Sequence, residues 1–224
     1  TGLIAYVSQG AAGPTSALAS WTNTAAGGFG AYNAALRNFA EASCAHVLFV
    51  SDANTDNNIP AALEADPFVC VTTVINDYVA GTQANPTLDG ALGRYDAVIW
   101  SASGNTGAGD VHRAATFTNL TAYVNAGGYV YVTGVDALAN PADPELVTFV
   151  GGTGAVDRFG AGSAPSALTA ASTPLTVGRV DIRGVTPVWG GTDYDALTGF
   201  GAGVTVVAVT ATNATRPEPV ARTT

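Results

Sequence analysis

The sequence predicts a three-layer α/β fold in which a mostly parallel sheet carries helices on both faces. Short apolar runs rich in Val and Ile recur along the chain. Segments with apolar residues at helical spacing lie between these runs. Because the runs are continuous rather than alternating, they are typical of strands that are buried on both faces.

The most regular part of the chain alternates strands with helices. We expect strands at 45–52, 68–75, 96–102 and 129–133, helices at 59–65 and 110–126, and a helical turn at 88–92. Asp110 is expected to cap the second helix, which stops at the glycine pair 127–128. The central strands should be parallel and should bury four aliphatic side chains, namely Val98, Ile99, Val130 and Val132.

The chain divides into three parts. Residues 1–43 form a βα extension of the sheet, with a strand at 3–8, or alternatively an arm that packs on a neighbouring subunit. Residues 44–210 form the α/β domain, which continues with a helix at 144–150, a loop at 159–173 and a strand at 204–209. Residues 211–224 form a Thr/Pro-rich tail or a final edge strand.

The composition excludes several classes of protein. The net charge of −9 repels a phosphate backbone, and no stretch gathers basic residues with aromatic ones, so nucleic acid is not an expected partner. The apolar runs fall far short of the roughly 20 residues that cross a bilayer. With 47% hydrophobic residues in 224, the chain is able to bury a core of its own.

Residue usage favours an exported protein, in the extracellular space or the cell envelope. The chain contains no Met, so we expect Thr1 to follow a removed leader, a propeptide or an artificial boundary. Only 11% of the residues are charged, and every cation is an arginine. Thr, Ser, Asn and Gly must therefore cover the surface, which suits an extracellular protein better than a cytosolic enzyme.

The two cysteines are Cys44 and Cys70. Cys44 precedes one predicted strand and Cys70 lies inside the next, so parallel alignment puts them several residues out of register. A disulfide needs Cα atoms about 4.4–6.8 Å apart. We therefore expect two small buried hydrophobes, and the disulfide is the alternative.

Three stretches carry a family resemblance: residues 47–52, 92–100 and 120–134. Their order of strand, Tyr-Asp before a strand, helix, glycine pair and strand resembles the class I glutamine amidotransferase-like superfamily, in its secreted bacterial and ThuA-like branches. Residues 193–197, followed by Gly201, are similar to that family's late section. The resemblance implies a flavodoxin-like or amidotransferase-like fold across residues 45–210. One such fold hosts many functions.

The catalytic residues of that family are missing from the matching positions. The resemblance puts a nucleophilic cysteine on the turn after the strand that ends near Thr133, but this turn reads Thr-Gly-Val-Asp over residues 133–136. The family's histidine follows late strands, whereas no histidine follows His112 here. The resemblance therefore implies the fold without glutaminase chemistry.

Ligands of open α/β sheets bind beyond the carboxyl ends of the strands. The catalytic candidates at this edge are Asp52, His112 and Asp136, which could supply acid–base chemistry. The alternative is structural, because the aspartates could cap a helix or close a turn and His112 could be solvated. The ligand-binding candidates are polar residues and a tryptophan that could stack on a sugar or pack under a loop: Gln9, Asn54, Ser103, Asn105 and Trp189.

A calcium loop is the one metal site with any support. Asp52, Asn54 and Asp56 match its first alternating oxygen ligands. The match then fails, because the loop needs Gly at position 57 and Glu at position 63, where this chain has Asn57 and Leu63. We therefore expect no cofactor and a loop that caps the next helix, with calcium as the alternative.

These observations favour an exported, non-catalytic module of a bacterial cell surface, with a role in binding or assembly. Its expected partners are other copies of itself or other domains of a larger protein. The alternative is a hydrolase or sugar-processing enzyme with a site at the strand ends. Residues 3–8 and 217–224 could extend a neighbour's sheet, or both could complete the sheet of their own chain.

Overall fold

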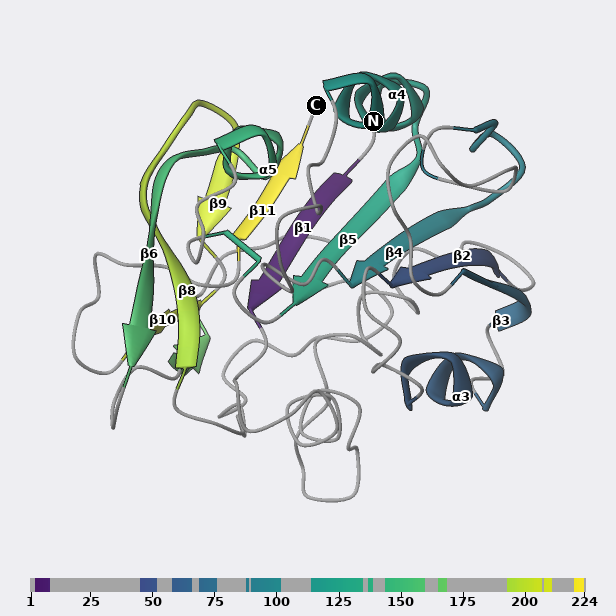
Figure 1. The fold of residues 1–224 in the computed structure, drawn as a ribbon, viewed down its shortest axis with the longest axis horizontal. Helices are drawn as coiled ribbons and strands as arrows, with labels where there is room; N and C mark the ends of the chain where they lie inside the picture. Colours follow the sequence, from purple (N-terminus) through teal and green to yellow (C-terminus); the bar gives the residue numbers. More distant parts are fainter. Residues whose placement is uncertain are drawn as a thin grey trace.

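The computed structural model describes the chain in separate stretches. They comprise residues 3–8, 45–51, 58–65, 69–75, 88, 90–101, 114–134, 137–138, 144–159, 165–168, 193–206, 208–210 and 220–223. Within these stretches a large sheet runs diagonally through the molecule, and helices lie beside it (Figure 1).

The large sheet has seven strands in the order β3-β2-β4-β5-β1-β11-β9. Every strand pair from β3 to β1 is parallel, whereas β11 is antiparallel to both β1 and β9. The prediction of a mostly parallel α/β sheet is therefore confirmed. The strands are β1 (Leu3–Ser8), β2 (Ala45–Ser51), β3 (Val69–Ile75), β4 (Ala97–Ser101), β5 (Tyr129–Gly134), β9 (Val204–Val206) and β11 (Val220–Thr223).

The centre of the sheet is buried on both faces. Every residue of β4 is buried, and Trp100 has no exposed surface. The four aliphatic side chains predicted to be buried at 98, 99, 130 and 132 have exposed fractions of 0, 1, 0 and 0%. Successive side chains of a strand point to opposite faces, so burial of consecutive residues requires cover on both sides. Continuous apolar runs thus predicted the central strands correctly.

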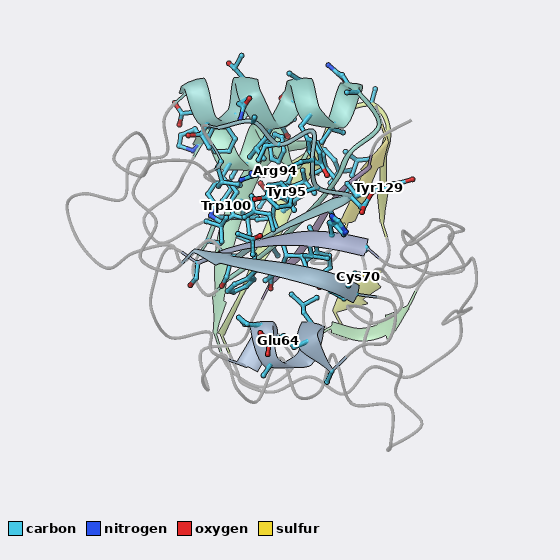
Figure 2. All side chains as sticks on the ribbon, turned by 90° about the vertical axis from the view of Figure 1, so that its right-hand side faces the viewer. Glu64, Cys70, Arg94, Tyr95, Trp100 and Tyr129 are labelled. Atoms are coloured by element: carbon cyan, nitrogen blue, oxygen red, sulfur yellow. The ribbon has the colours of Figure 1, made fainter. Side chains whose placement is uncertain are left out.

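Helices lie on opposite sides of the sheet. Helix α4 (Ala114–Asn125) lies on one side, next to α5 (Pro144–Phe149), and α3 (Asn58–Glu64) lies on the other (Figures 1 and 2). The α4 side holds the main hydrophobic cluster, in which the Phe117 ring lies 5.9 Å from Trp100 and 5.5 Å from Phe149. Helix α3 contributes the fully buried Leu63. The predicted cap at Asp110 lies outside the described residues.

The turn from α4 into β5 depends on two adjacent glycines. Gly127 has a φ of 104°, a conformation that residues with a Cβ rarely adopt. Its N–H donates to Val124 O at 2.9 Å, and the Gly128 N–H donates to Tyr123 O at 3.0 Å. This pair of bonds is the Schellman motif, which ends a helix and satisfies its last carbonyls. The predicted helix end at the glycine pair is confirmed.

The later part of the chain differs from the prediction. Two antiparallel pairs join segments that are distant in sequence: β6 (Gly152–Phe159) with β8 (Asp193–Phe200), and β7 (Pro165–Leu168) with β10 (Ala208–Thr210). The loop predicted at 159–173 thus contains a strand, and the strand predicted at 204–209 divides between two sheets. Gly, Ala, Ser and Thr dominate these segments, so partners rather than local propensity decide their structure.

The two ends of the chain complete its own sheet. Strand β1 lies between β5 and β11, and β11 lies between β1 and β9. Of the two alternatives for residues 3–8 and the tail, pairing within the chain is the one observed. In Figure 1, β1 and β11 run side by side near the middle of the sheet.

The expectation that the cysteines are unbonded is wrong, and so is the expectation that Cys70 is buried. Cys70 is exposed and disulfide-bonded, and Cys44 is the only other cysteine in the chain, so the bridge joins positions 44 and 70. The reason is a register shift: Ala45 pairs with Val69, but His46 pairs with Val71. Cys70 is therefore the extra residue of a bulge, next to the start of β2. The bulge puts Cys70 beside the first residues of β2, which strand alignment alone did not foresee.

Gly128→Ala should destabilise the protein, because a Cβ at this position would fall within the Tyr123 ring. That ring is buried, and its hydroxyl donates to Tyr95 O at 3.0 Å, so it has little room to shift. We expect a loss of about 1–3 kcal/mol in the free energy of unfolding, measured by urea titration. The matched control is Gly93→Ala, where a Cβ meets nothing within 4 Å. Equal unfolding midpoints for the two variants would contradict this packing.

Removal of the disulfide by a double Cys44→Ser, Cys70→Ser substitution should lower stability without changing the fold. The bridge closes a loop of about 25 residues. Restricting such a loop in the unfolded chain should contribute roughly 3–4 kcal/mol to the free energy of unfolding. Urea unfolding of the double variant, and of the parent protein with and without reductant, measures the effect. A parent protein whose midpoint does not respond to reductant would contradict the bridge.

Candidate functional site

The parallel strands end at one edge of the sheet, where hydroxyl side chains occupy matching positions. Ser51 of β2 pairs with Ser101 of β4, which pairs with Thr133 of β5. Since adjacent strands lie about 4.8 Å apart, the three hydroxyl residues form a row across the middle of the sheet. Their exposed fractions are 0, 1 and 4%. We call these three residues the hydroxyl row.

The hydroxyl row lies on the face of the sheet turned away from α4. Side chains alternate along each strand, and the preceding residues Val50, Trp100 and Val132 belong to the cluster on the α4 side. The row therefore faces the side on which α3 lies (Figure 1). Hydroxyl groups in such a buried position require hydrogen-bond partners, so this end of the sheet is polar where the rest of its centre is mostly apolar.

All the site residues predicted from the sequence lie outside the described residues. The strand ends from which they continue are nevertheless described, and they are neighbours in the order β2-β4-β5-β1. Asp52 follows β2, and Gln9 follows β1. Asp136 comes shortly after β5, and Ser103 shortly after β4. The topology thus brings together the ends of four strands as expected, and the remaining candidates outside the described residues are Asn54, Asp56, Asn105, His112 and Trp189.

Asp195 is a buried carboxylate that the sequence analysis did not select. It lies on β8 with no exposed surface, and its Oδ2 accepts a hydrogen bond from Leu138 N at 2.7 Å. Leu138 follows β5, so this contact fixes the backbone just beyond the central strand. The sequence contains a signal for this contact, because Asp195 lies between Tyr194 and the apolar residues Ala196 and Leu197. A carboxylate inside an apolar strand is costly unless it is hydrogen-bonded.

Asp96 has a structural role at the opposite edge. Its Oδ2 accepts from His46 N at 2.8 Å, and its own N–H donates to His46 O at 2.9 Å. The two bonds tie the start of β2 to the residue before β4. His46 is exposed at this amino-terminal edge, away from the hydroxyl row.

Tyr95 and Tyr123 form the second structural pair of the same region. The Tyr123 hydroxyl donates to Tyr95 O, and Tyr95 N donates to Leu92 O at 3.0 Å. Burial raises the pKa of Tyr123 well above its usual range, so this hydroxyl stays neutral and remains a donor. Arg94 lies 5.0 Å from the centre of the Tyr95 ring, on the α4 side of the sheet (Figure 2). The Tyr-Asp motif at residues 95–96 therefore holds the backbone around the start of β4.

The described residues offer neither a metal-binding cluster nor a membrane-spanning helix. Within the part of the chain that the structure describes, no three His, Cys, Asp or Glu side chains gather in a way that could hold a metal ion. The calcium candidates Asp52, Asn54 and Asp56 lie outside that part. Among the described helices, none has the length and apolar character to cross a membrane.

Comparison with known proteins yields no relatives: no family model, no curated protein and no solved structure matches this chain.

Asp195→Ala should release the backbone after β5. Loss of the acceptor leaves the Leu138 N–H buried without its bond, and we expect a cost of about 1–3 kcal/mol in the free energy of unfolding. Amide hydrogen exchange at Leu138 should also become faster, which loss of packing elsewhere would not cause by itself. The control is Glu64→Ala, which removes an exposed carboxylate of α3 and should change stability by less than about 0.5 kcal/mol. Unchanged exchange at Leu138 would refute the proposed contact.

Proposed function

We propose that this chain is an exported, non-catalytic module that acts in binding or assembly at a cell surface. The single observation that carries the proposal is the disulfide bond of Cys70. It bears on the compartment and on the chemistry of the protein at the same time.

The disulfide favours an oxidising compartment. Disulfides persist in extracellular and periplasmic proteins and are rare in the cytosol, where thiols are kept reduced. Cys70 is exposed on β3, so reductants of a cytosol would reach it. A bridge at this position is therefore best explained by a chain that works outside the cytosol, in the extracellular space or the envelope.

The same bridge removes the thiol chemistry of the family that the sequence resembles. Thiol catalysis needs a free thiolate, and both cysteines of this chain belong to the bridge. The turn after β5, where the resemblance puts the nucleophile, begins with Thr133 and Gly134. A polar edge without a thiol is suited to holding a ligand or another protein rather than to transferring an acyl group.

We further propose the three-layer, flavodoxin-like arrangement of the amidotransferase-like superfamily for this fold. The parallel order from β3 to β1 and the helices α3 and α4 on opposite sides are in keeping with it. The residues that carry the resemblance, Tyr95, Asp96, Gly127 and Gly128, all have structural roles here. A motif whose residues have structural roles supports a similar fold and gives no information about activity.

A second candidate function is a hydrolase or sugar-processing enzyme that uses Asp52, His112 and Asp136. The adjacent ends of β2, β4 and β5 favour it, because two of these residues continue from that group of strands. The discriminating experiment is hydrolysis of a panel of chromogenic glycosides and esters by the parent protein and by Asp52→Asn and Asp136→Asn variants. Activity that either substitution abolishes would favour the enzyme over the module.

Thiol counting tests the main proposal. Protein recovered from an oxidising compartment should give no reactive thiol in concentrated denaturant, and two thiols after reduction, because the chain has two cysteines. Cys70→Ser is the control and should give one thiol without reductant. Ammonia release from glutamine should be undetectable in both the oxidised and the reduced protein. Two free thiols before reduction, or measurable glutamine hydrolysis, would overturn the proposal.

A further inference from the structure

The disulfide closes a loop of the chain that contains a strand and a helix. Position 44 directly precedes β2, and Cys70 is the second residue of β3. The loop between them contains β2 and α3, so the bridge ties the start of β2 to the start of β3 around that helix. We call helix α3 and strand β3 the α3–β3 unit. Because the bridge joins this unit to the residue before β2, breaking it removes a covalent restraint from the unit first.

Cys70 lies where a thiol in solution is able to reach it. The residue is exposed, whereas every residue of the central strand β4 is buried. It is also the extra residue of the bulge, so the pairing of β3 with β2 runs without a shift only from Val71 onward. Thiol–disulfide exchange requires access to a sulfur, and exposed disulfides are typically the labile or regulatory ones. The position of Cys70 thus favours a bridge that opens in the folded protein.

The α3–β3 unit lies outside the main hydrophobic cluster. Among the described residues, the members of that cluster come from other elements and the segments beside them, and none comes from α3 or β3. Helix α3 lies on the other side of the sheet, where its Leu63 is buried (Figures 1 and 2). Regions outside the main core open locally at a lower free energy than the whole protein. The unit is therefore able to loosen while the cluster stays packed.

We propose that the bridge is a redox-sensitive switch that controls the order of the α3–β3 unit. The inference rests on the disulfide that supports the proposed function, and it adds a form of regulation to that function. With the bridge closed, the start of β3 is held beside the start of β2. With the bridge open, the unit keeps only non-covalent contacts and visits its open state more often. Strand β4 and helix α4 remain packed in both states.

The reaction that opens the bridge is a two-electron exchange with a dithiol reductant. One thiolate of the dithiol attacks the sulfur of Cys70, the bond between the two protein sulfurs breaks, and Cys44 leaves as a thiolate. The second thiolate of the dithiol then attacks the first sulfur of the same molecule and releases Cys70 as a thiolate. The two protein thiolates take up the two protons that the dithiol has lost. The dithiol is oxidised to a cyclic disulfide, and the bridge is reduced to two thiols.

The test is reduction of the parent protein by dithiothreitol without denaturant. Alkylation and mass measurement should show that both cysteines of the chain react. Amide hydrogen exchange, measured on peptides before and after reduction, gives the location of the effect. The acceleration in peptides that cover α3 and β3 should exceed that in peptides that cover β4 and α4 by at least about tenfold. A loss of global stability alone would accelerate all of these peptides by the same factor.

The double variant Cys44→Ser, Cys70→Ser is the matched control for the reductant itself. It should show the exchange pattern of the reduced parent protein, both with and without dithiothreitol. Uniform acceleration of all peptides, or a bridge that resists dithiothreitol until denaturant unfolds β4, would overturn the inference. A double variant that exchanges like the oxidised parent protein would overturn it too. None of these results affects the proposed function, because the thiol count decides whether the bridge exists.

Discussion

Burial of β4 on both faces is the constraint on which the rest of the structure depends. A strand with Ile99 directed to one side and Trp100 to the other, both out of water, needs a neighbour on each edge and a cover on each face. Strands β2 and β5 supply the edges, in parallel register. The aromatic contacts from Trp100 to Phe117 supply part of the cover on the α4 side. Parallel strands need long crossover connections, so the alternation of strands and helices follows from the same constraint.

The polar groups near this core are used to hold its connections. Asp96 ties the start of β2 to that of β4, Tyr123 binds the backbone before β4, and Asp195 binds the backbone after β5. Each contact satisfies a main-chain group that packing would otherwise leave without water. Asp96, Tyr123 and Asp195 therefore serve the architecture. The hydroxyl row lies at the carboxyl edge of the same sheet and is buried.

The disulfide holds one outer strand of the large sheet, among the strands that the structure describes. A bridge at the bulge fixes the beginning of β3, which is the outer strand, and leaves residues 71–75 regular. The same cysteines are thereby withdrawn from catalysis.

The sequence by itself determined the central strands, the helix that ends at Gly127, and the absence of a cysteine after Thr133. These features depend on local apolar runs, on local turn geometry and on residue identity, all of which can be read from neighbouring positions. The tertiary structure alone decided that β1 and β11 are neighbours, that β6 pairs with β8, that Asp195 binds Leu138, and that a bulge brings position 70 level with the start of β2. Each of these joins segments far apart in the chain. Their register is set by the packing free energy of the whole sheet, which no local pattern encodes.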